Sequence, residues 1–157
     1  TDGSKLLTTI LMFIGGSPGS TAGGAKTTTV VVMLLSAIAM IRSSHGVNVY
    51  GRRLEPETVH KASTVFCINL TLALVAILVI LAIQPLDFMD VCMEVFSAIG
   101  TVGMSTGVTR ELNNISKIII ILLMYCGRLG SLSFVLVFAQ KKKVPAIMNP
   151  QEKMLVG

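Results

Sequence analysis

Charged residues are scarce in this chain. Only 13% of its 157 residues are Asp, Glu, Lys or Arg, whereas 52% are hydrophobic. A soluble domain carries roughly one quarter charged residues, so this composition excludes an ordinary soluble domain. It predicts an all-α membrane protein.

The residues that catalysis or metal binding needs are equally sparse. Cys67, Cys92 and Cys126 lie far apart with no CxxC pair, and neither histidine has metal-ligand spacing. We interpret the cysteines as buried packing residues, and His45 and His60 as solvated residues of a basic loop. Because no paired carboxylates, nucleophile with a base, or metal cluster appears, we predict no enzyme activity and no cofactor.

The beginning of the chain lacks the features of a secretory signal. Thr1-Asp2-Gly3 has no basic residue, and the apolar run that follows leads into glycine rather than into a cleavage site. We therefore predict no signal peptide, and we expect the chain to be a piece of something longer.

Two long apolar runs, 65–83 and 118–139, are the candidate membrane spans. At about 1.5 Å per residue each matches a hydrocarbon core of roughly 30 Å. The formal net charge of +5 could suggest nucleic acid, but the cations are distributed by side of the membrane. They concentrate in the loop 42–63 and the tail 140–157, which the positive-inside rule predicts to be cytoplasmic. We expect no nucleic-acid partner.

A short amphipathic segment lies between the two spans. Its apolar residues recur at helical spacing over 87–99, with Asp87, Asp90 and Glu94 mostly off the apolar stripe. Pro85 and Asp87 are helix start signals. At about 1.5 Å per residue this helix reaches only roughly 18 Å, so a helix that enters the membrane here must turn back. Its negative C-terminal end favours a cation.

The turning segment is the glycine-rich filter loop 100–107. Irregular backbone survives at membrane depth only where it is buried in protein or lines a water-filled path. Spanning helix 64–83, pore helix 87–99, this loop and helix 115–139 therefore predict one pore-loop unit, 64–139. Within the loop, Thr101-Val102-Gly103 is similar to the carbonyl-lined filter of potassium channels.

The first third of the chain contains a second interruption. Apolar residues 6–14 and 30–41 are separated by a glycine-rich segment, 15–27, and together predict one broken helix over 1–41 with Lys26 near membrane depth. Residues 11–15 echo 123–127, which suggests that 1–41 is the second helix of another pore-loop unit. A phosphate-binding loop is excluded because Ala25 separates the glycine from the lysine. A passive linker remains possible, but a movable obstruction in a pore is the favoured interpretation.

Arg128 interrupts the last apolar run between two glycines. An intramembrane arginine costs at least roughly 2.5 to 3.5 kcal/mol unless it faces protein, water or a counter-charge. We predict that Arg128 contacts the glycine-rich segment 15–27, whose oxygens can accept its hydrogen bonds.

Three motifs together resemble the last third of bacterial Trk/Ktr/HKT superfamily potassium transporters, with the Ktr-type membrane subunit most similar. The motifs are GGSPGSTAGGAKTTT (15–29), SAIGTVGMSTGVT (97–109) and LMYCGRLGSL (123–132). The resemblance implies four pore-loop repeats around one pore, with an intramembrane gating loop that blocks the pore when closed. It implies filter residues Thr101, Val102, Gly103 and Met104, a gate contact at Arg128, and a gating loop of Gly15, Gly16, Ser17, Gly19, Ser20, Thr21, Gly23, Gly24 and Lys26.

The same resemblance implies partners. It implies a multi-pass protein of the bacterial cell membrane, in contact with lipid, that works as a homodimer with a cytoplasmic ring of nucleotide-binding regulatory subunits. The transported ion would be K⁺, often with stimulation by Na⁺, and no other metal is expected. The upstream repeats are absent from this chain, so it would supply one filter strand of four. Ala25 replaces a larger aliphatic residue, and we expect a slight change in gate closure.

The function predicted is passive, gated potassium uptake through a carbonyl-lined filter. Two alternatives stay open from the sequence: an energy-coupled cation carrier, and a non-conducting membrane anchor whose glycines serve close helix packing.

Overall fold

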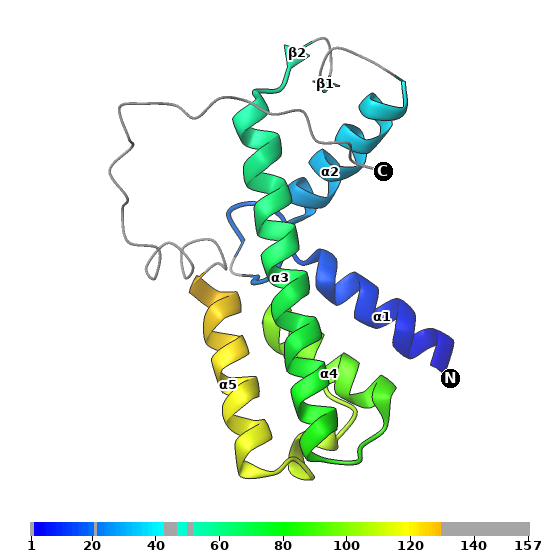
Figure 1. Ribbon diagram of the computed structural model, residues 1–157, viewed down its shortest axis with the longest axis vertical. Helices are drawn as coiled ribbons and strands as arrows, with labels where there is room; N and C mark the ends of the chain where they lie inside the picture. Colours follow the sequence, from blue (N-terminus) through cyan, green and yellow to red (C-terminus); the bar gives the residue numbers. More distant parts are fainter. Residues whose placement is uncertain (1, 21, 43–46, 50–51, 130–157) are drawn as a thin grey trace, which may run out of the picture.

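The computed structural model describes residues 2–20, 22–42, 47–49 and 52–129 (Figure 1). These residues form a helical fold with one short hairpin, β1 (Asn48–Val49) paired antiparallel with β2 (Arg52–Arg53), which the sequence did not predict. The all-α prediction is otherwise confirmed. The helices are α1 (Asp2–Ile14), α2 (Thr27–Ile41), α3 (Pro56–Ile83), α4 (Phe88–Gly100), the 3₁₀ helix η1 (Val108–Arg110) and α5 (Asn114–Leu129).

Helix α3 extends along the long axis of the molecule and begins earlier than predicted, at Pro56 rather than at residue 64 (Figure 1). Proline is favoured in the first turn of a helix, where its missing N–H is not needed. Glu57 and Lys61 then form an ion pair of 2.7 Å at i,i+4 spacing, which supports the added turns. His60 is therefore an exposed helical residue and not a loop residue as predicted, whereas His45 lies outside the described residues.

Among the described residues, α3 is the helix long and apolar enough to cross a membrane by length and composition, and α2 is a shorter apolar helix. Helix α5 is described as far as Leu129. The rest of the predicted span, 130–139, and the predicted tail, 140–157, lie outside the described residues.

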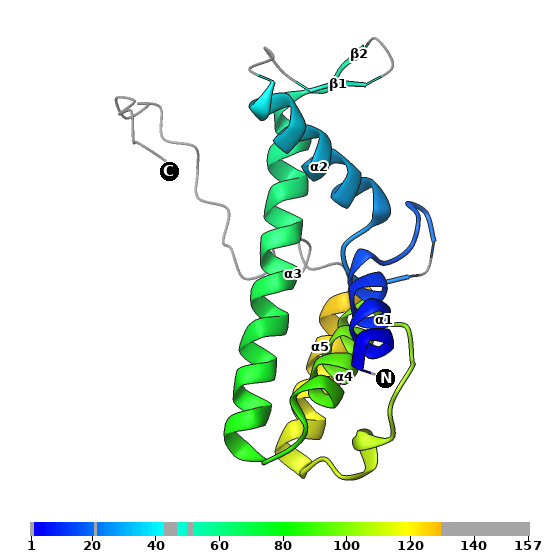
Figure 2. The ribbon, with the colours of Figure 1, turned by 90° about the vertical axis from the view of Figure 1, so that its right-hand side faces the viewer.

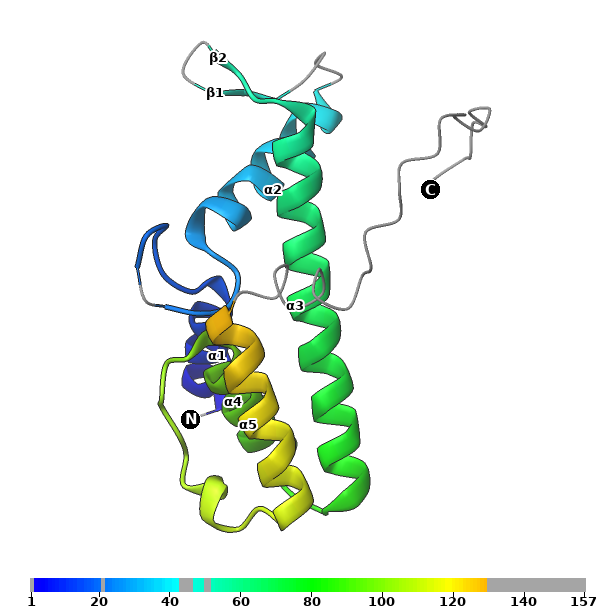
Figure 3. The same ribbon diagram turned by 90° about the vertical axis from the view of Figure 1, so that its left-hand side faces the viewer.

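The path of the chain from α3 to α5 reverses direction three times (Figures 2 and 3). Helix α4 starts beside the end of α3, runs back along it and stops partway up the molecule. Residues 101–107 then return, as an extended segment, to the end of the molecule at which α4 began, and α5 rises from there. The segments before and after α4 therefore both lead to the same end of the molecule, the end at which α4 begins.

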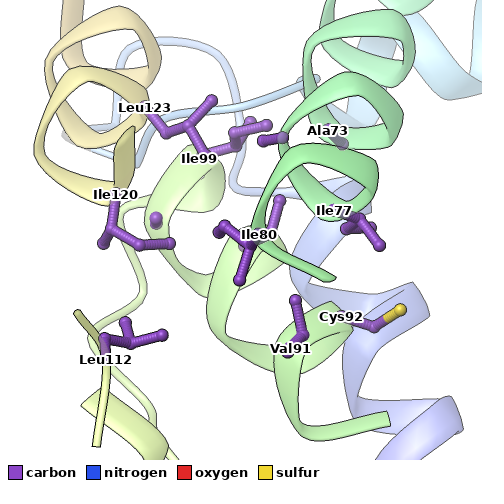
Figure 4. Close-up of a cluster of buried hydrophobic side chains, with 12 residues drawn as sticks. Ala73, Ile77, Ile80, Val91, Cys92, Ile99, Leu112, Ile120 and Leu123 are labelled. Atoms are coloured by element: carbon purple, nitrogen blue, oxygen red, sulfur yellow. The ribbon is translucent and has the colours of Figure 1, made fainter. Parts of the chain in front are cut away.

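The hydrophobic core surrounds α4, which contacts α1, α3 and α5. Figure 4 shows Val91 and Ile99 of α4 meeting Ile80 of α3 and Ile120 of α5. On the other side, the ring of Phe13 from α1 lies edge-on to Phe66 of α3 and Phe96 of α4, with ring centroids 5.2 and 5.4 Å apart. Such edge-to-face aromatic pairs stabilise a core beyond their buried area. Helix α4 is therefore enclosed by three other helices.

One expectation about burial was wrong, and the burial of one further residue was not predicted. Cys67 is exposed on α3, whereas Cys92 and Cys126 are buried as predicted. Glu94, which the helical pattern placed mostly off the apolar stripe, is only 6% exposed. Nearly the whole circumference of α4 is covered, so its amphipathic pattern did not distinguish a buried from an exposed face.

Candidate functional site

The start of α4 is defined by a side-chain cap. Asp87 is the N-cap, and its carboxylate accepts hydrogen bonds from the backbone N–H groups of Met89 and Asp90, at 3.1 and 3.3 Å. The prediction that Asp87 begins this helix is confirmed. An acidic N-cap satisfies N–H groups that have no partner within the helix and interacts favourably with the helix dipole.

The end of α4 leads directly into the predicted filter residues. Thr101 adopts a left-handed conformation with φ of 53°, and Gly103 follows with φ of 81°. The N–H of Thr101 donates to the Ala98 carbonyl and the N–H of Val102 to the Ser97 carbonyl, at 3.2 and 3.0 Å. These bonds tie the first two filter residues to the helix end and turn the chain sharply. Glycine at 103 is explained because a positive φ is costly for other residues.

The predicted gating loop connects α1 to α2, and its described residues, 15–20 and 22–26, have no regular structure. The N–H of Thr27 donates to the Gly16 carbonyl at 3.2 Å, which closes the loop at its base. Ser17 and Ser20 form an exposed turn in which both the N–H and the hydroxyl of Ser20 donate to the Ser17 carbonyl, at 3.1 and 2.6 Å. Gly19 is also in this exposed turn, and Thr21 lies outside the described residues.

The other limb of the loop is docked on the end of α4. The Gly23 N–H donates to the Gly100 carbonyl at 3.2 Å and to the Thr101 hydroxyl at 2.8 Å. The last carbonyls of a helix have no partner within it and carry partial negative charge. One amide of the gating loop therefore binds both the negative end of α4 and the first filter residue.

This docking requires backbones to approach closely. A Cβ atom on Gly23 would lie 2.8 Å from the Gly127 carbonyl oxygen and 2.9 Å from that of Ile99, and one on Gly127 would lie 2.1 Å from the Ile99 oxygen. Real Cβ atoms essentially never come within 3.0 Å of such atoms. Two glycines thus allow the loop, α4 and α5 to meet at one point. Ala25, beside them in the loop, is fully buried.

A cavity of about 570 Å³ lies beside this junction. Among the predicted site residues, it brings together Thr101 and Gly103 of the filter and Arg128 of α5. Ala22 of the predicted gating loop lines the same cavity, and the contact of Arg128 with that loop stays a prediction. The remaining lining residues are Ser97 and Met124. Lys26 is half-buried and directly precedes α2.

Sequence reasoning missed two polar connections to α4. Buried Glu94 accepts hydrogen bonds from the hydroxyls of Ser105 and Thr109. Lys5 of α1 forms an ion pair with Asp90 at 2.6 Å. The sequence does contain a signal for the Glu94 hydrogen bonds, namely a carboxylate in an apolar helix followed by a segment rich in hydroxyl side chains. The second joins residues 85 positions apart, so no local pattern could have shown it.

The long apolar helix α3 and the two glycine-rich segments packed at the end of α4 are consistent with a helical membrane protein. Within the described ranges, no group of three or more His, Cys, Asp or Glu side chains could hold a metal ion. The chain belongs to the TrkH family, because the family profile, described as a cation transport protein, matches residues 1–149.

Three relatives illustrate the similarity. The chain is 32% identical over 100% of its length to Ktr system potassium uptake protein D of Bacillus subtilis. It is 37% identical over 99% of its length to Ktr system potassium uptake protein B of the same organism. It is also 37% identical over 97% of its length to the potassium/sodium uptake protein NtpJ of Enterococcus hirae. The chain spans 35% of the length of each of these relatives.

Proposed function

We propose that this chain supplies one of the four filter strands, and the gating loop, of a pathway for gated potassium uptake. The observation that carries the proposal is the position of Gly23, whose N–H binds Gly100 and Thr101 where the predicted filter begins. The potassium uptake named in the relatives agrees with this assignment. No bond is made or broken in such a process, so this is a transport protein rather than an enzyme.

In this proposal α4 is the pore helix. Its C-terminal end, with a partial charge of roughly −0.5, favours a cation at the level of Thr101. The carbonyl groups of residues 101–104 replace part of the hydration shell of K⁺. Val102 and Met104 are 43% and 50% exposed here, on the segment against which three further strands would complete the filter.

Closure of the pathway is assigned to residues 15–26. The loop meets the filter at Gly23, and Arg128 faces the same cavity as Ala22. We propose that release of the Gly23 N–H from the end of α4 accompanies opening, and that Arg128 holds the loop in the closed state.

The membrane setting follows from the apolar surfaces. Many large apolar side chains are exposed on α1, α2, α3 and α5, including Leu7, Leu34, Leu78 and Ile121 at 60% or more. Exposed apolar patches of this kind mark contacts with lipid or with other protein segments. We propose a multi-pass protein of the bacterial cell membrane in which α3 runs outward from a cytoplasmic linker, now 42–55 because α3 begins at Pro56, and the tail 140–157 is cytoplasmic.

The partners are also part of the proposal. The names of the relatives refer to a Ktr system, which supports a membrane subunit that works with other components. We propose three further pore-loop repeats in the same polypeptide, a second copy of the subunit, and a cytoplasmic ring of nucleotide-binding regulatory subunits. Stimulation by Na⁺ is proposed as well.

Replacement of Gly103 tests the filter assignment. Gly103→Ser in the full-length polypeptide should abolish potassium selectivity, because φ of 81° disfavours any side chain and the local carbonyls must shift. The measurement is the ratio of K⁺ to Na⁺ uptake in proteoliposomes under an imposed ion gradient. Gly3→Ser is the control, since a Cβ atom on Gly3 meets nothing within 4 Å and Gly3 lies outside both the filter and the gating loop.

The alternatives give different results in the same assay. A non-conducting anchor predicts loss of assembly in Gly103→Ser and no selective flux in the unmodified protein. An energy-coupled carrier predicts that K⁺ flux requires a second gradient. Selective flux driven by the K⁺ gradient alone, lost in Gly103→Ser but kept in Gly3→Ser, supports the pore.

A further inference from the structure

A buried carboxylate lies behind the predicted filter segment. Glu94 is in the middle of α4 and is 6% exposed. Its Oε1 accepts a hydrogen bond from the Ser105 hydroxyl at 3.2 Å and another from the Thr109 hydroxyl. Both donors come from the segment that follows the filter, which we call the return limb (residues 105–109).

The return limb is linked internally through the same atoms. The N–H of Gly107 donates to the Ser105 hydroxyl oxygen at 2.9 Å, and the hydroxyls of Ser105 and Thr109 are 2.9 Å apart. Gly107 has a φ of 103°, which lets the limb turn into η1. One carboxylate oxygen therefore organises the whole turn.

A charged group in this position needs an explanation. Burial of a carboxylate is costly unless hydrogen bonds compensate, and its other oxygen, Oε2, has no hydrogen-bond partner within the described residues. An apolar side chain of similar size would fill the same space without this cost. Hydrogen bonds to a charged acceptor are stronger than neutral ones, so Glu94 provides a firm attachment.

The hydrogen bonds of Glu94 attach α4 to the return limb, which follows the filter residues 101–104. A second attachment holds the beginning of those residues. The N–H groups of Thr101 and Val102 bond to carbonyls at the end of α4. Gly103 and Met104 lie between these bonds and the return limb, so the pore helix holds the filter segment on both sides.

We propose that Glu94 is a positioning residue that determines ion selectivity. By holding the return limb on α4, it sets the spacing of the carbonyl groups of residues 101–104. This inference rests on the proposed filter function, because carbonyl spacing matters for selectivity only if those carbonyls coordinate the ion.

The test uses Glu94→Ala, Glu94→Gln and Thr109→Val in the full-length transporter. The readout is the ratio of the apparent KM values for K⁺ and Na⁺, which a general loss of stability would not change. Glu94→Ala should shift this ratio by about tenfold, the effect of losing a hydrogen bond to a charged acceptor. Glu94→Gln keeps an acceptor oxygen and should restore most of the ratio. Thr109→Val should give a smaller shift in the same direction and add little to Glu94→Ala.

Glu111→Gln is the matched control, since Glu111 is an exposed carboxylate near η1, and it should leave the ratio unchanged. The proposal is overturned if folded Glu94→Ala protein keeps the original ratio, or if only the maximal uptake rate falls. If Glu94→Ala does not fold, Thr109→Val and Ser105→Ala decide, and an unchanged ratio in both overturns the proposal. If Gly103→Ser also leaves the ratio of KM values unchanged, the filter assignment itself fails. If Gly103→Ser alters that ratio and the Glu94 variants do not, only the role of Glu94 fails.

Discussion

The two glycine-rich segments of this chain are held in different ways. The filter segment and its return limb are tied to their own helix, with hydrogen bonds from Ser105 and Thr109 to Glu94 that span 11 and 15 positions. The gating loop docks through Gly23, which bonds to a residue 78 positions away. One segment is anchored to its own helix, and the other is anchored to a helix far along the chain.

This difference has a physical consequence. A segment bonded to its own helix moves with that helix, so its carbonyl groups keep their relative positions. A loop bonded to a distant helix can separate from it while each helix keeps its own internal hydrogen bonds. The first arrangement suits selection among ions, and the second suits a gate.

The largest effect is expected when the docking contact itself is blocked. In Gly23→Ala the new Cβ would lie 2.8 Å from the Gly127 oxygen and 2.9 Å from the Ile99 oxygen. Overpacking of about 1–3 kcal/mol would shift the gate toward open by roughly 5- to 150-fold. The measurement is ion flux through proteoliposomes under conditions that keep the unmodified protein closed.

Gly3→Ala is the control for this substitution, since a Cβ on Gly3 meets nothing within 4 Å. It should leave closed-state flux unchanged. Low closed-state flux in folded Gly23→Ala protein would show that the loop does not close the pathway by docking here.

A smaller effect is expected when one acceptor is removed. Thr101→Val deletes the hydroxyl that binds the Gly23 N–H at 2.8 Å and keeps the β-branched shape. The Gly100 carbonyl still accepts from the same N–H, so the loss is about 0.5–1.5 kcal/mol, or roughly 2- to 12-fold in closed-state flux. Thr101→Ser retains the hydroxyl and should behave as the unmodified protein. Equal leak in both variants would contradict the role of this hydrogen bond.

The smallest effect is expected at the ion pair between α1 and α4. Lys5→Met or Asp90→Asn breaks a 2.6 Å pair whose side chains are 34% and 20% exposed. Partial solvent screening limits how much this ion pair stabilises the fold. Each substitution should therefore lower the midpoint of thermal unfolding by about 1–2 °C, with little change in gating. A double-mutant cycle in detergent measures the coupling.

The exposed pair of Glu57 and Lys61 is the matched control, at 72% and 64% exposure, and its removal should have no measurable effect. If Lys5→Met changed gating as much as Thr101→Val, then α1 and the gating loop would act as one unit with α4. That result would remove the contrast between the two glycine-rich segments.

Local features of the fold could be predicted from the sequence. Asp87 begins α4 because its carboxylate caps nearby N–H groups, and this signal needs only neighbouring residues.

The similar runs 11–15 and 123–127 show the limit of such signals. Helix α1 ends before Gly15, but α5 continues through Gly127 to Leu129. Gly15 has φ of 64°, whereas Gly127 stays helical and is needed for close approach to Ile99.

The burial of Glu94 and the exposure of Cys67 were not predicted from the sequence. Glu94 was placed by a periodic pattern that assumes one buried face, but α4 is covered on nearly all sides. Cys67 was expected to be buried because free cysteine usually is, yet it is exposed on α3.

The sequence by itself determined the helices, the two glycine-rich interruptions and the membrane class, because hydrophobicity, capping and glycine sterics act over a few residues. Only the tertiary structure decided that Gly23 meets Thr101, that Gly127 admits Ile99, and that Glu94 holds the return limb. These contacts depend on how α1, α3 and α5 pack around α4. Packing is a property of surfaces brought together by folding, so no spacing along the chain records it.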